Sequence, residues 1–189
     1  NTGGLNLDAI LNDQGNTFDR AVAIENETGT LQTGIGSSVQ LAVDQASPGD
    51  TISVGPGTFD ESVTIDTEGV TVEGPNAGIA GDSDQRGPEA TITDANGRLV
   101  IEASNVEIDG FNFEFDESAI QSKSGDDNLI TNTRFELTGT TSDSYAVRVG
   151  GGSPGTDVTN NLFTDIVSND GTSGDNVNGV VVTDPRDTT

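Results

Sequence analysis

One frame recurs in this chain: Val106-Glu107-Ile108-Asp109-Gly110-Phe111-Asn112-Phe113. It returns as Asn128-Leu129-Ile130-Thr131-Asn132-Thr133-Arg134-Phe135 and as Val158-Thr159-Asn160-Asn161-Leu162-Phe163, and Val70-Thr71-Val72-Glu73-Gly74 is a partial copy. The final phenylalanines of the three longer copies lie 22 and 28 residues apart. This interval is too long for one strand and suits one turn of a solenoid, whose units bury their apolar faces by stacking on neighbours.

Aligning the copies places similar residues in columns. One column is aliphatic, one holds Gly110, Asn132 and Asn160, and one holds the three phenylalanines. We expect the phenylalanines to stack inside the coil and Asn132 and Asn160 to form an amide ladder at a turn. Because alternate residues of a strand point to the same side, the sequence also predicts an aliphatic interior. Its members are Ile52, Val54, Val63, Ile65, Val70, Val72, Ile92, Val100, Val106, Ile108, Ile120, Ile130, Val147, Val149, Val158, Val180 and Val182.

Charge and composition exclude several classes of function. The 189 residues carry 32 Asp and Glu against 7 Lys and Arg, a formal net charge of −25. Phosphate binding needs a basic patch, so nucleic acid and anionic membrane surfaces are not expected partners. Such an acid excess is typical of proteins adapted to molar salt, where a Debye length of about 3 Å screens self-repulsion. An ordinary acidic secreted protein is the alternative.

The residue types that are absent limit the chemistry further. The chain has no Cys, His or Met, so it lacks disulfides and the usual nitrogen and sulfur ligands of metals. Among metals this leaves cations that bind oxygen ligands, such as calcium, with Asp82, Asp84, Asp126 and Asp127 as candidate ligands. No segment predicts a membrane span. We expect the chain to be a processed protein or a piece of a longer one, with 184–189 as a polar tail or linker.

Residues 1–36 do not share the repeat and form a predicted lead-in segment. Strands are indicated at Ala21-Val22-Ala23-Ile24 and around Leu31. This segment either packs on its own solenoid or pairs with a neighbouring molecule. Asn26-Glu27-Thr28 matches the N-glycosylation pattern, which makes Asn26 a candidate glycosylation site.

A short helix is predicted immediately after this segment. Ser37 and Gln40 have the spacing of a capping box, Val39, Ala42, Val43 and Ala46 share one face, and Pro48-Gly49 ends the helix. From Ser38 to Asn76 the sequence resembles the N-terminal cap and first coil of right-handed parallel β-helix proteins of the pectin-lyase-like superfamily, in the version found on haloarchaeal surfaces. The resemblance extends over residues 37–183 and implies a fold, whereas activities within that superfamily vary.

The run Ser124-Gly125-Asp126-Asp127-Asn128 is the sharpest catalytic candidate. Paired carboxylates suit glycosidic cleavage, and Gly-Asp-Asp is similar to part of the polygalacturonase site. That site also has Gly-His-Gly and Arg-x-Lys motifs, which this chain lacks. A polar turn is the alternative interpretation. Arg148, expected outward with Glu107, Asp109 and Thr131 on nearby coils, could line a lyase groove or form a surface ion pair.

These observations predict an all-β fold: a right-handed parallel β-helix of about five coils over residues 37–183, with a short N-terminal capping helix. The predicted function is an extracellular structural, adhesive or assembly module of a halophilic archaeal surface, without a cofactor. Its expected partners are copies of itself, other surface proteins or polysaccharide. The helix is expected to cap the N-terminal end, whereas the C-terminal coil at 179–182 has no evident cap. This coil either continues into a further domain or pairs head to tail with another copy, which would give filaments. A polysaccharide lyase or hydrolase, and a receptor-binding spike on an archaeal virion, are the alternatives.

Overall fold

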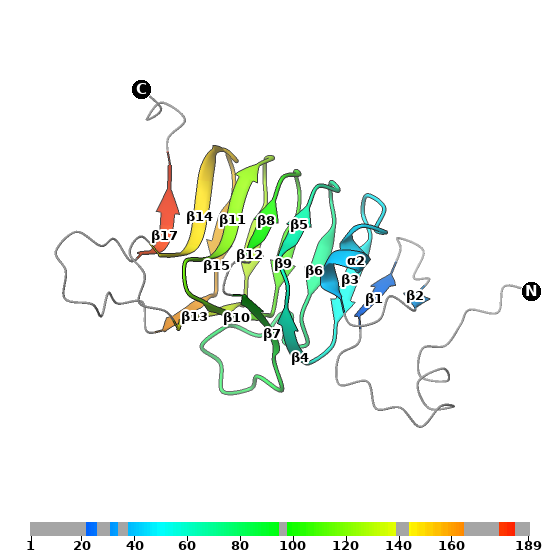
Figure 1. Cartoon of the computed structure of the whole chain (residues 1–189), viewed down its shortest axis with the longest axis horizontal. Coiled ribbons are helices and arrows are strands. Elements are labelled where there is room, and N and C mark those ends of the chain that lie inside the picture. The colour runs from blue at the N-terminus through cyan, green and yellow to red at the C-terminus, as the bar shows by residue number, and fades with distance from the viewer. Residues whose placement is uncertain are drawn as a thin grey trace, which may run out of the picture.

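The structure, a computed structural model, describes residues 22–25, 31–33, 38–94, 98–138, 144–164 and 178–183. These residues form an all-β parallel solenoid (Figure 1). The elements are β1 (Val22–Glu25), β2 (Leu31–Thr33), α2 (Val39–Val43), β3 (Thr51–Val54), β4 (Gly57–Asp60), β5 (Val63–Ile65), β6 (Thr71–Glu73), β7 (Ala90–Asp94), β8 (Leu99–Ile101), β9 (Glu107–Asp109), β10 (Asn112–Phe115), β11 (Ser118–Ser124), β12 (Leu129–Thr131), β13 (Arg134–Leu137), β14 (Tyr145–Gly152), β15 (Asp157–Thr159), β16 (Leu162–Thr164) and β17 (Asn178–Val182).

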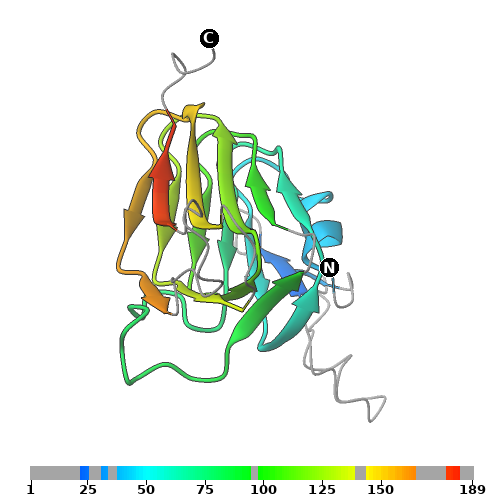
Figure 2. The same ribbon diagram turned by 60° about the vertical axis from the view of Figure 1, so that its left-hand side comes forward.

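Successive strands enter three sheets in turn, as Figure 2 also shows. The first sheet has the order β15-β12-β9-β6-β3-β1-β2, the second β16-β13-β10-β7-β4, and the third β17-β14-β11-β8-β5. Each contains five parallel strands, and β1 and β2 extend the first sheet with antiparallel pairs. The strands expected near Val22 and Leu31 are therefore confirmed, and β1 pairs with β3 of the same chain.

The three copies of the repeated frame lie in register. Ile108, Ile130 and Val158 face one another across β9, β12 and β15. Phe113, Phe135 and Phe163 form the predicted stack, with ring centroids 5.5 and 5.1 Å apart and interplanar angles of 14° and 9°. Parallel pairing without a register shift forces equal side chains into contact at the strand spacing, which explains why the frame recurs.

The predicted interior is confirmed except at four positions. Thirteen of the seventeen aliphatic residues are buried. Val100 is only half-buried, because Leu99 and Ile101 pair with Val63 and Ile65 and point inward instead. Because Leu99, Val100 and Ile101 are all apolar, the sequence alone does not show which of them point inward. The other three exceptions, Val158, Val180 and Val182, belong to β15 and β17, the last strands of their sheets.

The turn column is confirmed and the amide ladder is wrong. Gly110, Asn132 and Asn160 all have positive φ, at 78°, 52° and 55°, which is the left-handed turn conformation that Gly and Asn tolerate best. However, Asn132 Nδ2 donates to Asp109 Oδ1 at 2.8 Å. A carboxylate is a stronger acceptor than an amide, so the side chain turns toward Asp109 and not toward Asn160.

The helix begins one residue later than predicted. Its N-cap is Ser38, whose Oγ accepts the Leu41 N–H at 3.2 Å, whereas Ser37 lies outside the described residues. Glu61 supplies further caps, since its carboxylate accepts the N–H groups of Val39 at 2.7 Å and Gln40 at 3.2 Å. The predicted apolar face is confirmed, with Val39, Ala42 and Val43 buried and Ala46 packed against the core.

Candidate functional site

The structure places Asp126 and Asp127 in the turn between β11 and β12. Both side chains are exposed. Their main-chain groups hold the turn: Asp126 N–H donates to Ser104 Oγ at 3.1 Å, and Asp127 N–H donates to Pro154 O at 3.0 Å. Asp127 also has a positive φ of 56°. The main chain at both residues therefore forms part of a hydrogen-bonded turn, and a catalytic role for their exposed carboxylates remains a prediction.

Arg148 lies on the outward side of β14, opposite Gln121 and Val181. Its guanidinium lies over the Tyr145 ring, 5.9 Å from the centroid, and its Nε is buried without a hydrogen bond. Glu107, Asp109 and Thr131 belong to the first sheet, whereas Arg148 belongs to the third. Within the described ranges, no hydrogen bond or ion pair joins Arg148 to these residues or to Asp126 or Asp127, so the expected groove remains a prediction.

Asp82 and Asp84 are exposed in the segment between β6 and β7. Over the residues that the structure describes, no group of three or more acidic side chains has a metal-binding arrangement. The calcium sites remain predictions. Asn26 lies outside the described residues. The described part of the chain also contains no helix of the length and hydrophobicity that a membrane span requires.

Sequence reasoning missed Arg86, the side chain that makes the most hydrogen bonds within the described residues. It projects from the segment 75–89, which joins β6 to β7, and only 2% of it is exposed. Nε and Nη2 donate to the two carboxylate oxygens of Glu89, both at 2.8 Å. The only signal for it in the sequence is the scarcity of basic residues, 7 in the whole chain.

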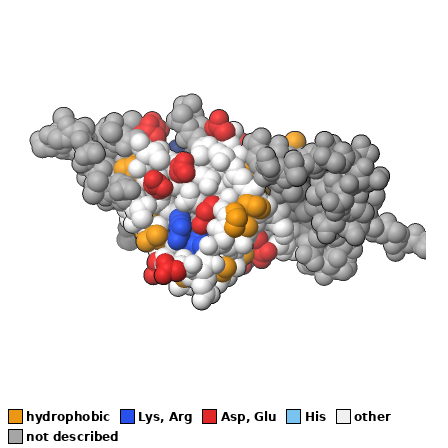
Figure 3. Space-filling model, turned by 90° about the horizontal axis from the view of Figure 1, so that it is seen from below, with side chains coloured by type: hydrophobic (Ala, Val, Ile, Leu, Met, Phe, Trp, Pro, Cys, Tyr) orange, Lys and Arg blue, Asp and Glu red, His pale blue; other side chains and the backbone are white. Residues whose placement is uncertain are grey.

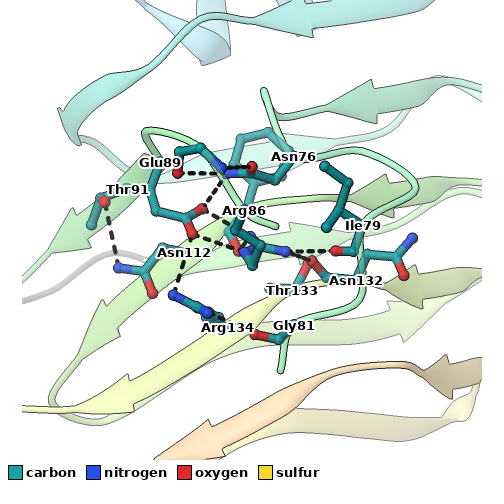
Figure 4. Close-up of polar contacts among 12 residues, drawn as sticks. Asn76, Ile79, Gly81, Arg86, Glu89, Thr91, Asn112, Asn132, Thr133 and Arg134 are labelled. Carbon is teal, nitrogen blue, oxygen red and sulfur yellow. Dashed lines mark hydrogen bonds and ion pairs between the residues drawn. The ribbon is translucent and has the colours of Figure 1, made fainter. Parts of the chain in front are cut away.

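The other N–H groups of Arg86 bind one main-chain oxygen of its own segment and two from different coils (Figure 4). Nη1 donates to Asn132 O at 2.6 Å and to Ile79 O at 2.8 Å, and Nη2 donates to Phe111 O at 3.1 Å. Phe111 follows β9 and Asn132 follows β12, so one side chain ties the segment to two successive turns. We call the segment 75–89 the strap.

Additional contacts carry the strap further along the solenoid. Gly78 N–H donates to the Asp109 carboxylate, at 3.0 Å to Oδ2. Gly81 N–H donates to Asn160 O at 2.8 Å, and Arg134 Nε donates back to Gly81 O at 2.6 Å. The strap thus leaves β6, reaches the turn after β15, and returns to β7. Around it, the face shown in Figure 3 presents a small basic patch among acidic and apolar side chains.

The outward side of the first sheet is acidic near its centre. Glu107 and Asp109 lie on β9, and Glu73 on β6 pairs with Asp109. Burial raises the pKa of Glu107 above its ordinary value of 4.5, and the neighbouring charges of Asp109 and Glu73 raise it further. The Asp109 carboxylate accepts hydrogen bonds from the Gly78 N–H and from Asn132 Nδ2.

One end of the solenoid leaves apolar side chains in solvent. The strands β15, β16 and β17 end the three sheets on that side, with β17 at one extremity of the stack in Figure 1. Val180 and Val182 continue the inward columns of Val147 and Val149, yet they are 42% and 74% exposed. Phe163 likewise continues the aromatic column and is only half-buried.

Comparison with known proteins supplies no relative from which a function could be transferred. The chain matches no protein-family model, no curated protein and no solved structure.

Proposed function

We propose that this chain is an extracellular structural and assembly module, built as a right-handed β-helix of about five coils with α2 as its N-terminal cap. The observation that carries the proposal is the open end, where Val180 and Val182 stand in register with buried columns and remain exposed. A solenoid end of this kind stabilises an assembly when another surface covers it.

The polar side chains also support a structural role. The contacts of Arg86, Asp109 and Asn132 are internal ones that hold turns and the strap. The repeated positions of the frame are inward aliphatics, turn residues and stacked phenylalanines. None of these groups performs acid–base or nucleophilic chemistry.

We place the module on the surface of a halophilic archaeon because of its net charge of −25 and its resemblance to haloarchaeal β-helices. Charge of one sign destabilises a compact state unless salt screens it. Far-UV circular dichroism during stepwise removal of salt tests this assignment. Loss of the β signal on dilution from molar salt is expected, and full retention of it in low salt would contradict the halophilic origin.

The assembly function is tested by the mass in solution. We expect light scattering in molar salt to give a mass above that of the 19.4 kDa chain, with the excess rising with concentration. A monomer at every concentration would exclude assembly through this end.

A further inference from the structure

The open end offers main-chain groups as well as apolar side chains. Thr183 N–H donates to Val149 O at 2.9 Å, toward β14. Since successive residues of a strand direct their main-chain groups to opposite neighbours, the N–H and C=O groups of Val180 and Val182 face away from the stack. No strand within the described ranges lies beyond β17. This edge therefore combines unpaired hydrogen-bonding groups with exposed aliphatic side chains.

The opposite end of the solenoid is closed in two of its three sheets. In the first sheet, β1 pairs antiparallel along the whole of β3, and the edge that remains is β2, a strand of only three residues. In the third sheet, the side-chain amide of Gln40 occupies the edge of β5. Its Oε1 accepts the Thr64 N–H at 2.6 Å and its Nε2 donates to Thr64 O at 3.2 Å, as the peptide group of another strand would.

This asymmetry disfavours head-to-tail stacking. The β17 edge of one molecule would have to displace Gln40 before it could pair with β5 of the next. A sheet edge that is very short, or that a side chain already covers, prevents another strand from pairing with it. Among the described residues, no strand or side-chain amide occupies the edge of β17 at the open end.

The three strands at the open end carry little charge. Asp157 is the only charged residue in β15, β16 and β17, although the chain as a whole carries −25. Of the residues in these strands, two approaching copies therefore bring only their Asp157 carboxylates toward each other. The net negative charges of the two molecules still repel each other at long range. At molar salt the Debye length is about 3 Å, so this repulsion is screened.

We infer that the open end of this chain binds the same end of a second copy, related by a two-fold axis, with β17 antiparallel to β17 of the partner. The inference rests on the proposed assembly function and names its partner and geometry. A two-fold contact uses the same surface on both molecules and closes after two copies. It buries Val180 and Val182 and yields a dimer, whereas a head-to-tail contact would yield a filament.

Single-cysteine variants can report the geometry, because the chain has no cysteine of its own. Val181→Cys places a thiol on β17, and Leu41→Cys places one on α2 at the other end, where Leu41 is 50% exposed. Each variant, and an equal mixture of the two, is treated with a short bis-maleimide in molar salt. The two-fold contact predicts that Val181→Cys links to itself, that Leu41→Cys alone does not, and that the mixture gives no Leu41–Val181 product.

The mass in solution separates this inference from the proposed function. We expect light scattering to level off at twice the chain mass, and Val182→Asp to raise the dissociation constant about a hundredfold, because it places a charge in the apolar contact. Masses that exceed the dimer, together with Leu41–Val181 products, would overturn the two-fold geometry and leave assembly intact. A monomer without Val181 cross-links would overturn both.

Discussion

The buried Arg86 and the half-buried Glu89 form a bidentate ion pair, with Nε–Oε1 and Nη2–Oε2 distances of 2.8 Å. Planar pairing of this kind is the strongest geometry that an arginine and a carboxylate can adopt. Here the pair also fixes the orientation of the guanidinium. Its remaining N–H groups therefore point at the carbonyl oxygens of Phe111 and Asn132 and donate hydrogen bonds to them. The pair therefore orients the group that joins the strap to two coils.

Replacing Arg86 with Met should destabilise the protein by about 3 kcal/mol, because the carbonyl groups of Ile79 and Asn132 lose the donor of their hydrogen bond and Glu89 loses its two shortest contacts with a cation. Chemical denaturation at constant high salt measures the change. The matched control is Lys123→Met, which removes the exposed pair between Lys123 and Glu102, with 59% and 36% of the side chains exposed. It should cost less than about 1 kcal/mol. Equal losses in the two variants would show that the strap contributes little to stability.

A second prediction concerns the closest approach of the strap to the coils. A Cβ on Gly81 would lie 2.6 Å from Leu162 N and 2.7 Å from Thr133 O, both of them main-chain atoms. Gly81→Ala should therefore force the strap outward and cost about 1–3 kcal/mol. Gly87→Ala in the same strap is the control, since its nearest neighbour would be 3.8 Å away, and it should change stability by less than about 1 kcal/mol. Thermal unfolding of both variants would measure the difference, and indistinguishable midpoints would refute the close packing.

The third prediction compares two members of the phenylalanine column that differ in how deeply they are buried. Phe135 is fully buried between Phe113 and Phe163, and Phe163 is half-buried at the open end. Phe135→Ala should cost about 3–5 kcal/mol, and Phe163→Ala clearly less, because its cavity opens to solvent. Denaturant midpoints at equal protein concentration would reveal the order. A greater loss at Phe163 would mean that the last strand, and not the middle of the column, limits stability.

The repeat made the strands and the core of the solenoid predictable from the sequence. The contacts of the strap and the exposure of the open end could not be predicted in this way. Phe113 and Phe135 could be aligned because equal spacing in parallel strands places equal residues in register. Arg86 has no such signature: Asn132 O, which accepts one of its hydrogen bonds, lies 46 residues downstream and belongs to the main chain. Likewise, the alternation of Val180 and Val182 predicts that they point inward. It does not reveal that no further strand of the described chain covers them.

The last prediction follows from the raised pKa of Glu107. The unfolded chain has the ordinary value of 4.5, so the folded state holds the proton more tightly. Stability should therefore fall as the pH rises from that value through the folded pKa, and the full penalty should persist at neutral pH. Below both pKa values, the protonated side chain resembles glutamine in charge.

Glu107→Gln should accordingly stabilise the protein at neutral pH and lose that advantage at a pH of about 3. Denaturant midpoints of the variant and the parent across this range, at constant ionic strength, measure the effect. Glu117→Gln, in the exposed turn between β10 and β11, removes the same charge and corrects for the general relief of repulsion. If the two variants respond equally at every pH, then overall charge, and not the neighbourhood of Asp109 and Glu73, governs the acidic face of the first sheet.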